Sequence, residues 1–180
     1  MRAGSSDENG SAWPRGRSID GGIDEIPLPA GVDGRLWLCG KHVIGPDPDG
    51  VVARVDATSV VCLTQRHELS DRFPDYVAWL DREVGSRAVW HPIHDLSVPA
   101  HGAFADLVAD VATRLRAGER VIVHCAAGIG RAGTLAVGVM IHLGMERSDA
   151  LQHVAAHRPM AGPEVGAQAA LIEAFAARPR

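Results

Sequence analysis

Residues 121–134 bring a nucleophile, a cation and three glycines into one short stretch of the sequence. The stretch reads V-I-V-H-C-A-A-G-I-G-R-A-G-T, so that Cys125 follows an apolar run and Arg131 stands six residues later. A cysteine thiolate is a strong nucleophile, and the planar guanidinium group of arginine matches two oxygens of a phosphate. The spacing therefore predicts an anion clamp beside a reactive sulfur.

The glycines predict how the backbone around these two residues is arranged. Gly128 and Gly130 lie between a β-branched run at 120–124 and an apolar segment at 132–143, which predict a buried strand and a buried helix, and Gly133 is the second residue of that segment. Such a turn lets successive N–H groups point into one concavity that binds an oxyanion, and the helix adds the positive end of its dipole. A cysteine in this field is favoured as the thiolate and can attack phosphorus in line. We expect the phosphoryl oxygens to be held by the loop residues Ala126, Ala127, Gly128, Ile129, Gly130 and Arg131.

The complete pattern, H-C-x-x-G-x-x-R-A-G-T, resembles the H-C-x5-R signature of the cysteine-dependent protein tyrosine phosphatases. Ala132 stands where Ser or Thr is more usual in that family, and several small dual-specificity members carry Ala there. The short chain without large insertions resembles the compact dual-specificity branch. The resemblance covers about residues 34–176 and implies a cysteinyl-phosphate intermediate, formed by Cys125 and stabilised by Arg131.

A second segment supplies a candidate proton donor. Residues 90–99 read W-H-P-I-H-D-L-S-V-P and resemble the P-I-x-D…P acid loop of the same family, with Asp95 thirty residues before Cys125. The resemblance implies that Asp95 protonates the leaving oxygen in the first step and activates water in the second. The alternative is that Asp95 caps the helix expected to begin near residue 100.

Two further residues complete the expected catalytic set. Thr134 lies near the start of the helix that follows the loop, where its hydroxyl can donate a hydrogen bond to the sulfur and ease its departure. Gln168 follows the dipeptide Arg158-Pro159, near the start of a late helix. In the family a glutamine in such a place positions the hydrolytic water; the alternative is a surface glutamine.

Alternating strands and helices must position these residues. Apolar runs predict strands at about 35–39, 59–63, 87–90 and 120–124, and apolar spacing predicts helices at about 70–84, 102–117, 132–143, 147–157 and 162–177. This order predicts an α/β domain with a central, mostly parallel sheet of about 4–5 strands flanked by helices, similar to the protein tyrosine phosphatases. Residues 45–50 read as a turn-rich loop.

The start of the chain differs from the rest. Residues 1–33 are rich in Gly, Ser, Asp, Pro and Arg and show no apolar period, which predicts a disordered tail. Within it, residues 26–29 are expected to lie extended against the domain. Residues 34–180 are then the catalytic domain.

Composition limits the class of protein. A chain of 180 residues that is 46% hydrophobic and 22% charged is typical of one soluble domain. The net charge of −4 disfavours a nucleic-acid partner. The first eighteen residues lack the apolar segment of a secretory signal, and no apolar stretch is long enough to span a membrane. We therefore expect a cytoplasmic protein without a membrane span.

The three cysteines, Cys39, Cys62 and Cys125, form no CxxC pair and no disulfide framework. Cys62 lies near the end of a strand expected beside that of Cys125. It either fills the core or traps Cys125 in a reversible disulfide, as relatives with a nearby second cysteine do, because a strand's period of two leaves its face undetermined. His153 and His157 lack a third ligand, so we expect no metal and no other cofactor.

Together these patterns predict a phosphate monoester hydrolase that acts on a phosphorylated protein or peptide, with phosphotyrosine and phosphoserine or phosphothreonine left open. The loop carries no Lys, which disfavours a polyphosphorylated lipid headgroup. The alternatives are a phosphatase of a small-molecule or lipid phosphate and a phosphate-binding module without turnover. The chain is taken as a monomer, although the sequence leaves its oligomeric state open.

Overall fold

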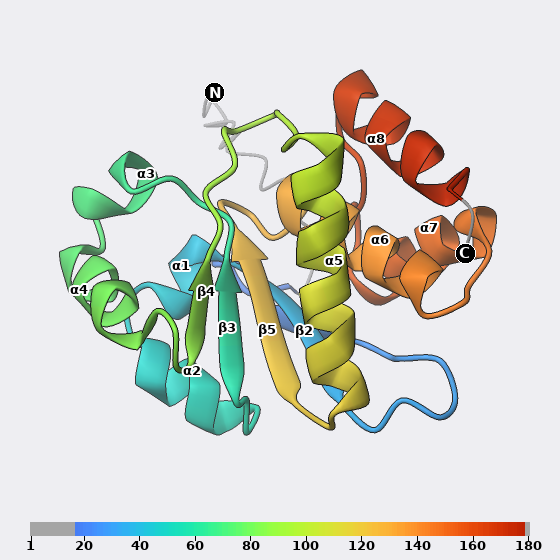
Figure 1. Cartoon of the computed structure of the whole chain (residues 1–180). Helices are drawn as coiled ribbons and strands as arrows, with labels where there is room; N and C mark the ends of the chain where they lie inside the picture. The colour runs from blue at the N-terminus through green and yellow to red at the C-terminus, as the bar shows by residue number, and fades with distance from the viewer. Residues whose placement is uncertain (1–16, 179–180) are drawn as a thin grey trace, which may run out of the picture.

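The computed structural model describes residues 17–178 and has one five-stranded sheet at its centre (Figure 1). The strand order is β1-β2-β5-β3-β4. β1 pairs antiparallel with β2, and the other pairs are parallel. The predicted α/β class with a mostly parallel sheet is therefore confirmed. The strands are β1 Ile23–Ile26, β2 Arg35–Gly40, β3 Ser59–Cys62, β4 Ala88–Trp90 and β5 Arg120–Cys125.

Helices cover both faces of the sheet (Figure 1). The side chains of the first four described helices pack on one face, and those of the last four pack on the other. The first group is α1 Lys41–Ile44, α2 Pro48–Arg54, α3 His67–Ser70 and α4 Pro74–Glu83. The second group is α5 His101–Arg116, α6 Gly130–His142, α7 Arg147–His157 and α8 Gly166–Ala176.

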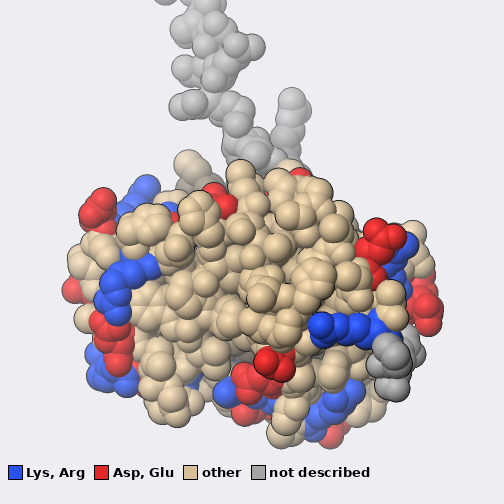
Figure 2. All heavy atoms as spheres, turned by 45° about the horizontal axis from the view of Figure 1, so that its top comes forward, with Lys and Arg blue, Asp and Glu red and all other residues tan. Residues whose placement is uncertain are grey.

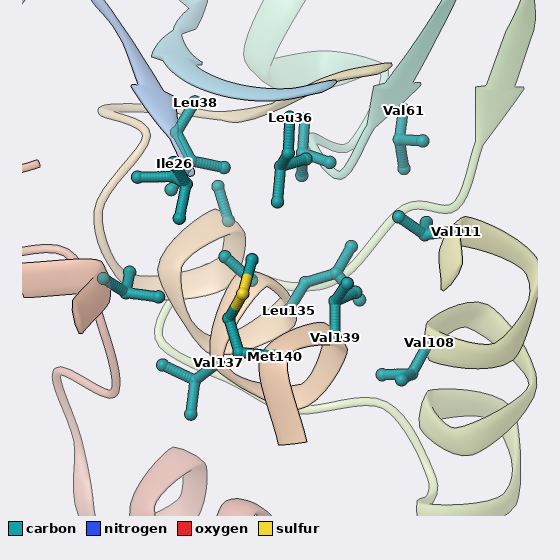
Figure 3. Close-up of a cluster of buried hydrophobic side chains, with 14 of the residues drawn as sticks. Ile26, Leu36, Leu38, Val61, Val108, Val111, Leu135, Val137, Val139 and Met140 are labelled. Atoms are coloured by element: carbon teal, nitrogen blue, oxygen red, sulfur yellow. The ribbon is translucent and has the colours of Figure 1, made fainter. Parts of the chain in front are cut away.

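The alternation of side chains along β5 divides the core into two layers. Val121 and Val123 face α5 to α8, whereas Ile122 faces α1 to α4. α6 crosses the first of these layers, and Figure 3 shows Met140 and Leu135 among the sheet's apolar side chains. Because α6 is buried through almost its whole length, its amino-terminal end is fixed in position directly after β5.

The tail predicted for residues 1–33 is wrong in its second half. Residues 23–26 form an edge strand that pairs with β2, and Ile26 is fully buried. Leu28 and Val32 also pack against the core, so residues 26–29 lie against the domain as expected. The edge strand at residues 23–26 is short and mostly half-buried, so its sequence shows only a weak apolar pattern. Residues 1–16 lie outside the described part of the chain.

Two of the expected boundaries are also wrong. The helix predicted at 70–84 begins four residues later, as α4 at Pro74, because proline favours the first turn of a helix. Ser70, expected as a possible cap of that helix, is the last residue of α3. The loop expected at 45–50 contains the start of α2, whose N-cap Asp47 accepts a hydrogen bond from the Gly50 amide at 2.9 Å.

Among the described residues, no helix is both long and apolar enough to cross a membrane.

Candidate active site

Cys125 is the last residue of β5 and lies at the carboxyl edge of the sheet. The loop that follows bends back over its side chain, and the Gly128 amide donates a hydrogen bond to the Cys125 Sγ at 3.2 Å. Gly128 has φ +74°, and a Cβ at this position would come within 2.3 Å of the Cys39 carbonyl oxygen. Only glycine satisfies both conditions, so the glycine in the motif has a specific backbone role.

Arg131 lies in the first turn of α6 and is only 4% exposed. Its Nη1 and Nη2 each donate to a carboxylate oxygen of Glu68 at 2.8 Å. Its Nη1 also donates to the Ile93 carbonyl oxygen at 2.8 Å. Glu68 in α3 and the segment after β4 thus fix the orientation of the guanidinium plane.

Glu68 is a site residue that the sequence pattern did not predict. Burial by itself raises the pKa of Glu68, but hydrogen bonds from Arg131 and from the Gln65 amide outweigh it and lower that pKa below its ordinary value. Burial lowers the pKa of Arg131, and its hydrogen bond to Glu68 reverses that effect and raises the pKa. Both groups are therefore charged at neutral pH. The signal that could have found Glu68 is its place shortly after β3, the strand beside β5.

Asp95 lies between β4 and α5, with its Oδ1 3.0 Å from the Arg131 Nη2. Its side chain is 60% exposed. The segment before it is held to the sheet, because the Ile93 amide donates to the Leu63 carbonyl oxygen at 3.0 Å. α5 begins after Ala100 and has no side-chain cap, so the helix-cap alternative for Asp95 is wrong.

Thr134 and Gln168 line one small cavity together with Arg131. Among the described residues, the buried Thr134 hydroxyl has no hydrogen-bond partner, so the expected bond to the sulfur is not formed in this conformation. Gln168 is 1% exposed. Its Oε1 accepts from the Glu164 amide at 2.8 Å, and its Nε2 is 3.4 Å from the Ser97 carbonyl oxygen. The alternative of a surface glutamine is therefore wrong.

His124 supports the loop from behind. It is fully buried, and burial lowers its pKa to about 4, which makes the imidazole neutral at physiological pH. The His124 Nδ1 faces the Cys125 carbonyl oxygen at 3.4 Å, and because a carbonyl oxygen only accepts, the imidazole hydrogen is assigned to Nδ1. The His124 Nε2 then accepts from the Tyr76 hydroxyl at 2.6 Å, and burial raises the pKa of Tyr76 and keeps that hydroxyl protonated. His124 orders the backbone at Cys125.

Cys62 does not face Cys125. It packs with Cys39 and Ile122 on the α1 to α4 side of the sheet, whereas Cys125 belongs to the opposite layer. Burial raises the pKa of both Cys39 and Cys62 to about 12, so neither forms a thiolate readily. The core alternative for Cys62 fits this geometry, and the reversible disulfide with Cys125 does not.

His153 and His157 bond to backbone groups. The His153 Nε2 is 2.7 Å from the Pro27 carbonyl oxygen, and the His157 Nδ1 is 2.8 Å from the His153 carbonyl oxygen. Within residues 17–178 no cluster of three or more His, Cys, Asp or Glu side chains could hold a metal ion.

A cysteine at the end of a central parallel strand is followed by a glycine loop and by an arginine in the next helix, and the match to a phosphatase family model places the chain among the cysteine-dependent phosphatases. The chain belongs to the family described as "Dual specificity phosphatase, catalytic domain", whose model matches residues 52–177. A search of curated protein sequences gives no match.

Solved structures share this fold at low sequence identity. The active form of Tk-PTP is 22% identical, with a TM-score of 0.67 over 87% of this chain and 98% of its own. Kinase associated phosphatase, with its catalytic cysteine replaced by serine, is 19% identical, with a TM-score of 0.72 over 88% and 97%. PTPMT1 in complex with PI(5)P is 16% identical, with a TM-score of 0.63 over 78% and 89%. At these identities the likeness establishes the fold.

Proposed function

We propose that this protein hydrolyses phosphate monoesters on phosphorylated proteins or peptides through a cysteinyl-phosphate intermediate. The observation that carries the proposal is the meeting of two segments far apart in the sequence. The Asp95 carboxylate lies 3.0 Å from the Arg131 guanidinium, which belongs to the same loop and helix turn as the nucleophile. A proton donor, an anion clamp and a sulfur nucleophile thereby share one site.

In the first step, the Cys125 Sγ attacks phosphorus and forms an S–P bond while the bond from phosphorus to the leaving oxygen breaks. The protonated Asp95 gives its proton to that oxygen, so the product leaves as a neutral hydroxyl compound. Arg131 and the inward-facing loop amides stabilise the charge on the three remaining phosphoryl oxygens.

In the second step, Asp95 is a carboxylate and takes a proton from the attacking water. Phosphorus forms a bond to the water oxygen, and the S–P bond breaks to return the thiolate. Gln168 lies beside Arg131 along the same cavity and is the residue we assign to orienting the water. A rotation of the unpaired Thr134 hydroxyl toward Sγ would stabilise the departing sulfur.

A singly phosphorylated group fits the charge of the site. Lys41 is the only lysine of the chain, and its Nζ donates a hydrogen bond to the Glu68 carbonyl oxygen at 2.9 Å. Figure 2 turns the carboxyl ends of the parallel strands toward the viewer, and charged side chains on that face lie mainly toward its rim. One phosphate is matched by Arg131 and the loop amides without further cations.

The test is hydrolysis of para-nitrophenyl phosphate in the presence of EDTA. We expect Cys125→Ser to lose more than about 10³-fold in kcat, and Asp95→Asn about 10²-fold. Cys62→Ser is the matched control, because it changes a buried cysteine on the opposite face of the sheet and should retain activity. Full activity in Cys125→Ser, or no activity in reduced wild type, would refute the cysteine mechanism.

The substrate class needs a separate comparison. Phosphotyrosine peptides, phosphoserine and phosphothreonine peptides, a small sugar phosphate and vesicles containing a phosphatidylinositol monophosphate should be compared by kcat/KM. We expect a phosphopeptide to be preferred. A higher kcat/KM for the sugar phosphate or the vesicles would overturn the protein-substrate assignment and leave the chemistry intact.

A further inference from the structure

Arg158, the residue directly after α7, lies behind the phosphate-binding loop and is fully buried. Its Nε donates to the Gly128 carbonyl oxygen at 2.7 Å, and its Nη2 donates to the Ala127 carbonyl oxygen at 2.8 Å. One edge of the guanidinium fork therefore bonds two consecutive peptide groups of the loop. A single planar cation with five N–H donors is suited to this task.

These two bonds determine which way the loop amides point. The described peptide bonds are all trans, so the carbonyl of one residue and the N–H of the next point in opposite directions. With the Ala127 carbonyl turned toward Arg158, the Gly128 N–H points toward the Cys125 Sγ, as its 3.2 Å distance confirms. By the same rule, the Gly128 carbonyl bonded to Arg158 turns the Ile129 N–H toward the anion side.

The preceding peptide group is fixed in the same way by another donor. The Lys41 amide donates to the Ala126 carbonyl oxygen at 3.0 Å, which turns the Ala127 N–H inward. Three successive peptide groups thus have outward carbonyls bonded to the rest of the protein, and two of the three bond to Arg158.

The remaining edge of Arg158 bonds the amino-terminal part of the domain. Its Nη1 donates to the Asp24 Oδ2 at 2.5 Å and to the Leu38 carbonyl oxygen at 3.3 Å. Asp24 lies on β1 and also forms an ion pair with Arg17. Burial lowers the pKa of Arg158 from its ordinary value, and the Asp24 carboxylate opposes that shift. A buried cation needs such a partner to remain charged.

We propose that Arg158, held by Asp24, is a positioning residue that fixes the loop amides in their anion-binding orientation and adds positive charge behind the nucleophile. β1 is then part of the support of the active site. This inference rests on the proposed cysteine chemistry, but its first test does not depend on turnover.

The first readout is the pH dependence of Cys125 alkylation by iodoacetamide, quantified on the Cys125 peptide by mass spectrometry in the full chain. Arg158→Gln removes both the fork and the charge, so the alkylation midpoint should move upward by about 1 pH unit. Asp24→Asn removes the carboxylate that holds Arg158, so its midpoint should also move upward, by less than that of Arg158→Gln because the cation is retained. Thermal unfolding of both variants is recorded in parallel, and both should lose stability.

Structural support alone would lower stability without moving the Cys125 midpoint, so a rise of the midpoint in both variants identifies positioning. In the kinetic readout, kcat/KM of Arg158→Gln should fall about 10–100-fold, less than or equal to the loss of one oxyanion donor. Arg158→Lys should keep the midpoint near wild type but recover only part of kcat/KM, because one ammonium cannot span two carbonyls and Asp24. If Arg158→Gln does not fold, Arg158→Lys still tests the geometry.

Glu25→Gln is the matched control. Glu25 is the neighbour of Asp24 on β1 and pairs with the exposed Arg35 at 2.6 Å, away from the loop. It should change neither the midpoint nor kcat/KM. An unchanged midpoint in a folded Arg158→Gln, or an upward shift of the same size in Glu25→Gln, would overturn the proposal. If the alkylation midpoints shift as expected but the protein hydrolyses no phosphate ester, the proposed function is refuted and the positioning role of Arg158 stands.

Discussion

Replacing Glu68 by Gln tests how Arg131, the proposed phosphate-binding residue, is held. The Glu68 carboxylate accepts two hydrogen bonds from Arg131 and a third from the Gln65 amide, all at 2.8 Å. The Glu68 side chain is 12% exposed and that of Arg131 is 2% exposed, so solvent screens this pair only weakly. In the amide, one oxygen becomes an NH2 group, which places a donor against a donor of Arg131.

The size of the effect follows from that one lost bond. A hydrogen bond to a charged group contributes about 1.5–3 kcal/mol, so the free energy of unfolding should fall by about 2–3 kcal/mol. For a chain of this size that lowers the Tm by roughly 5–10 °C. The same loss of support for Arg131 should lower kcat/KM about 10–100-fold, since each factor of ten equals about 1.4 kcal/mol.

The pH dependence has a definite sign. The pKa of Glu68 is lowered in the folded state, so its stabilising effect is present above its ordinary value of 4.5 and is lost as the pH falls through the folded pKa. The difference in unfolding free energy between wild type and Glu68→Gln should therefore shrink below pH 4.5. Urea unfolding at pH 7 and pH 4, with para-nitrophenyl phosphate kinetics at pH 6, measures both effects.

Asp110→Asn is the control for Glu68→Gln. It removes an ion pair with Arg114 at 3.0 Å on the outer face of α5, and its effect on stability should stay below about 1 kcal/mol. Activity should be unchanged. If Glu68→Gln matches this control in both stability and kcat/KM, Arg131 is positioned by other contacts and the argument from the carboxylate is wrong.

Two further perturbations test the rest of the site. Burial lowers the pKa of His124 from 6.5 to about 4, so between these two pH values the imidazole is protonated in the unfolded chain and neutral in the folded one. The free energy of unfolding of wild type should therefore fall by about 2 kcal/mol between pH 7 and pH 5. His124→Asn should show a shallower loss in urea unfolding; an equal slope would assign it to other groups. Gly133→Ala places a Cβ 2.1 Å from the Gly162 amide nitrogen, so the free energy of unfolding should fall by about 1–3 kcal/mol or more. Gly166→Ala is the control, because a Cβ there meets no atom within 4 Å, and its thermal unfolding should not show this loss. Equal stability of these two alanine variants would contradict the close packing of α6 on the segment at 162.

The sequence predicted the loop well because its chemistry lies in consecutive residues. The strand at 120–124, the glycine turn and Arg131 are local features, and local periodicity also placed α5, α6 and α7 within about two residues. The role proposed for Asp95 required the family resemblance, since nothing in its neighbours shows that the segment after β4 folds back onto Arg131. β1 was not predicted as a strand because a four-residue edge strand has no clear alternation of burial.

The residues that sequence reasoning missed act across long separations. Glu68 meets Arg131 over 63 positions, and Asp24 meets Arg158 over 134 positions. Each is one charged residue among many in the sequence. The antiparallel pairing of β1 with β2, and the parallel pairing of β2 and β3 with β5, place them near the loop after β5. Spacing along the chain carries no information about such contacts.

Two buried arginines lie on opposite sides of the loop, and each of them is paired with a carboxylate. Arg131 reaches the anion side and is compensated by Glu68, whereas Arg158 bonds the outer carbonyls and is compensated by Asp24. Without its carboxylate, each buried guanidinium would carry a desolvation cost that favours leaving the site. The motif therefore specifies which chemistry the loop performs, and two carboxylates outside it, one on each side of β5, specify the geometry in which that chemistry is possible.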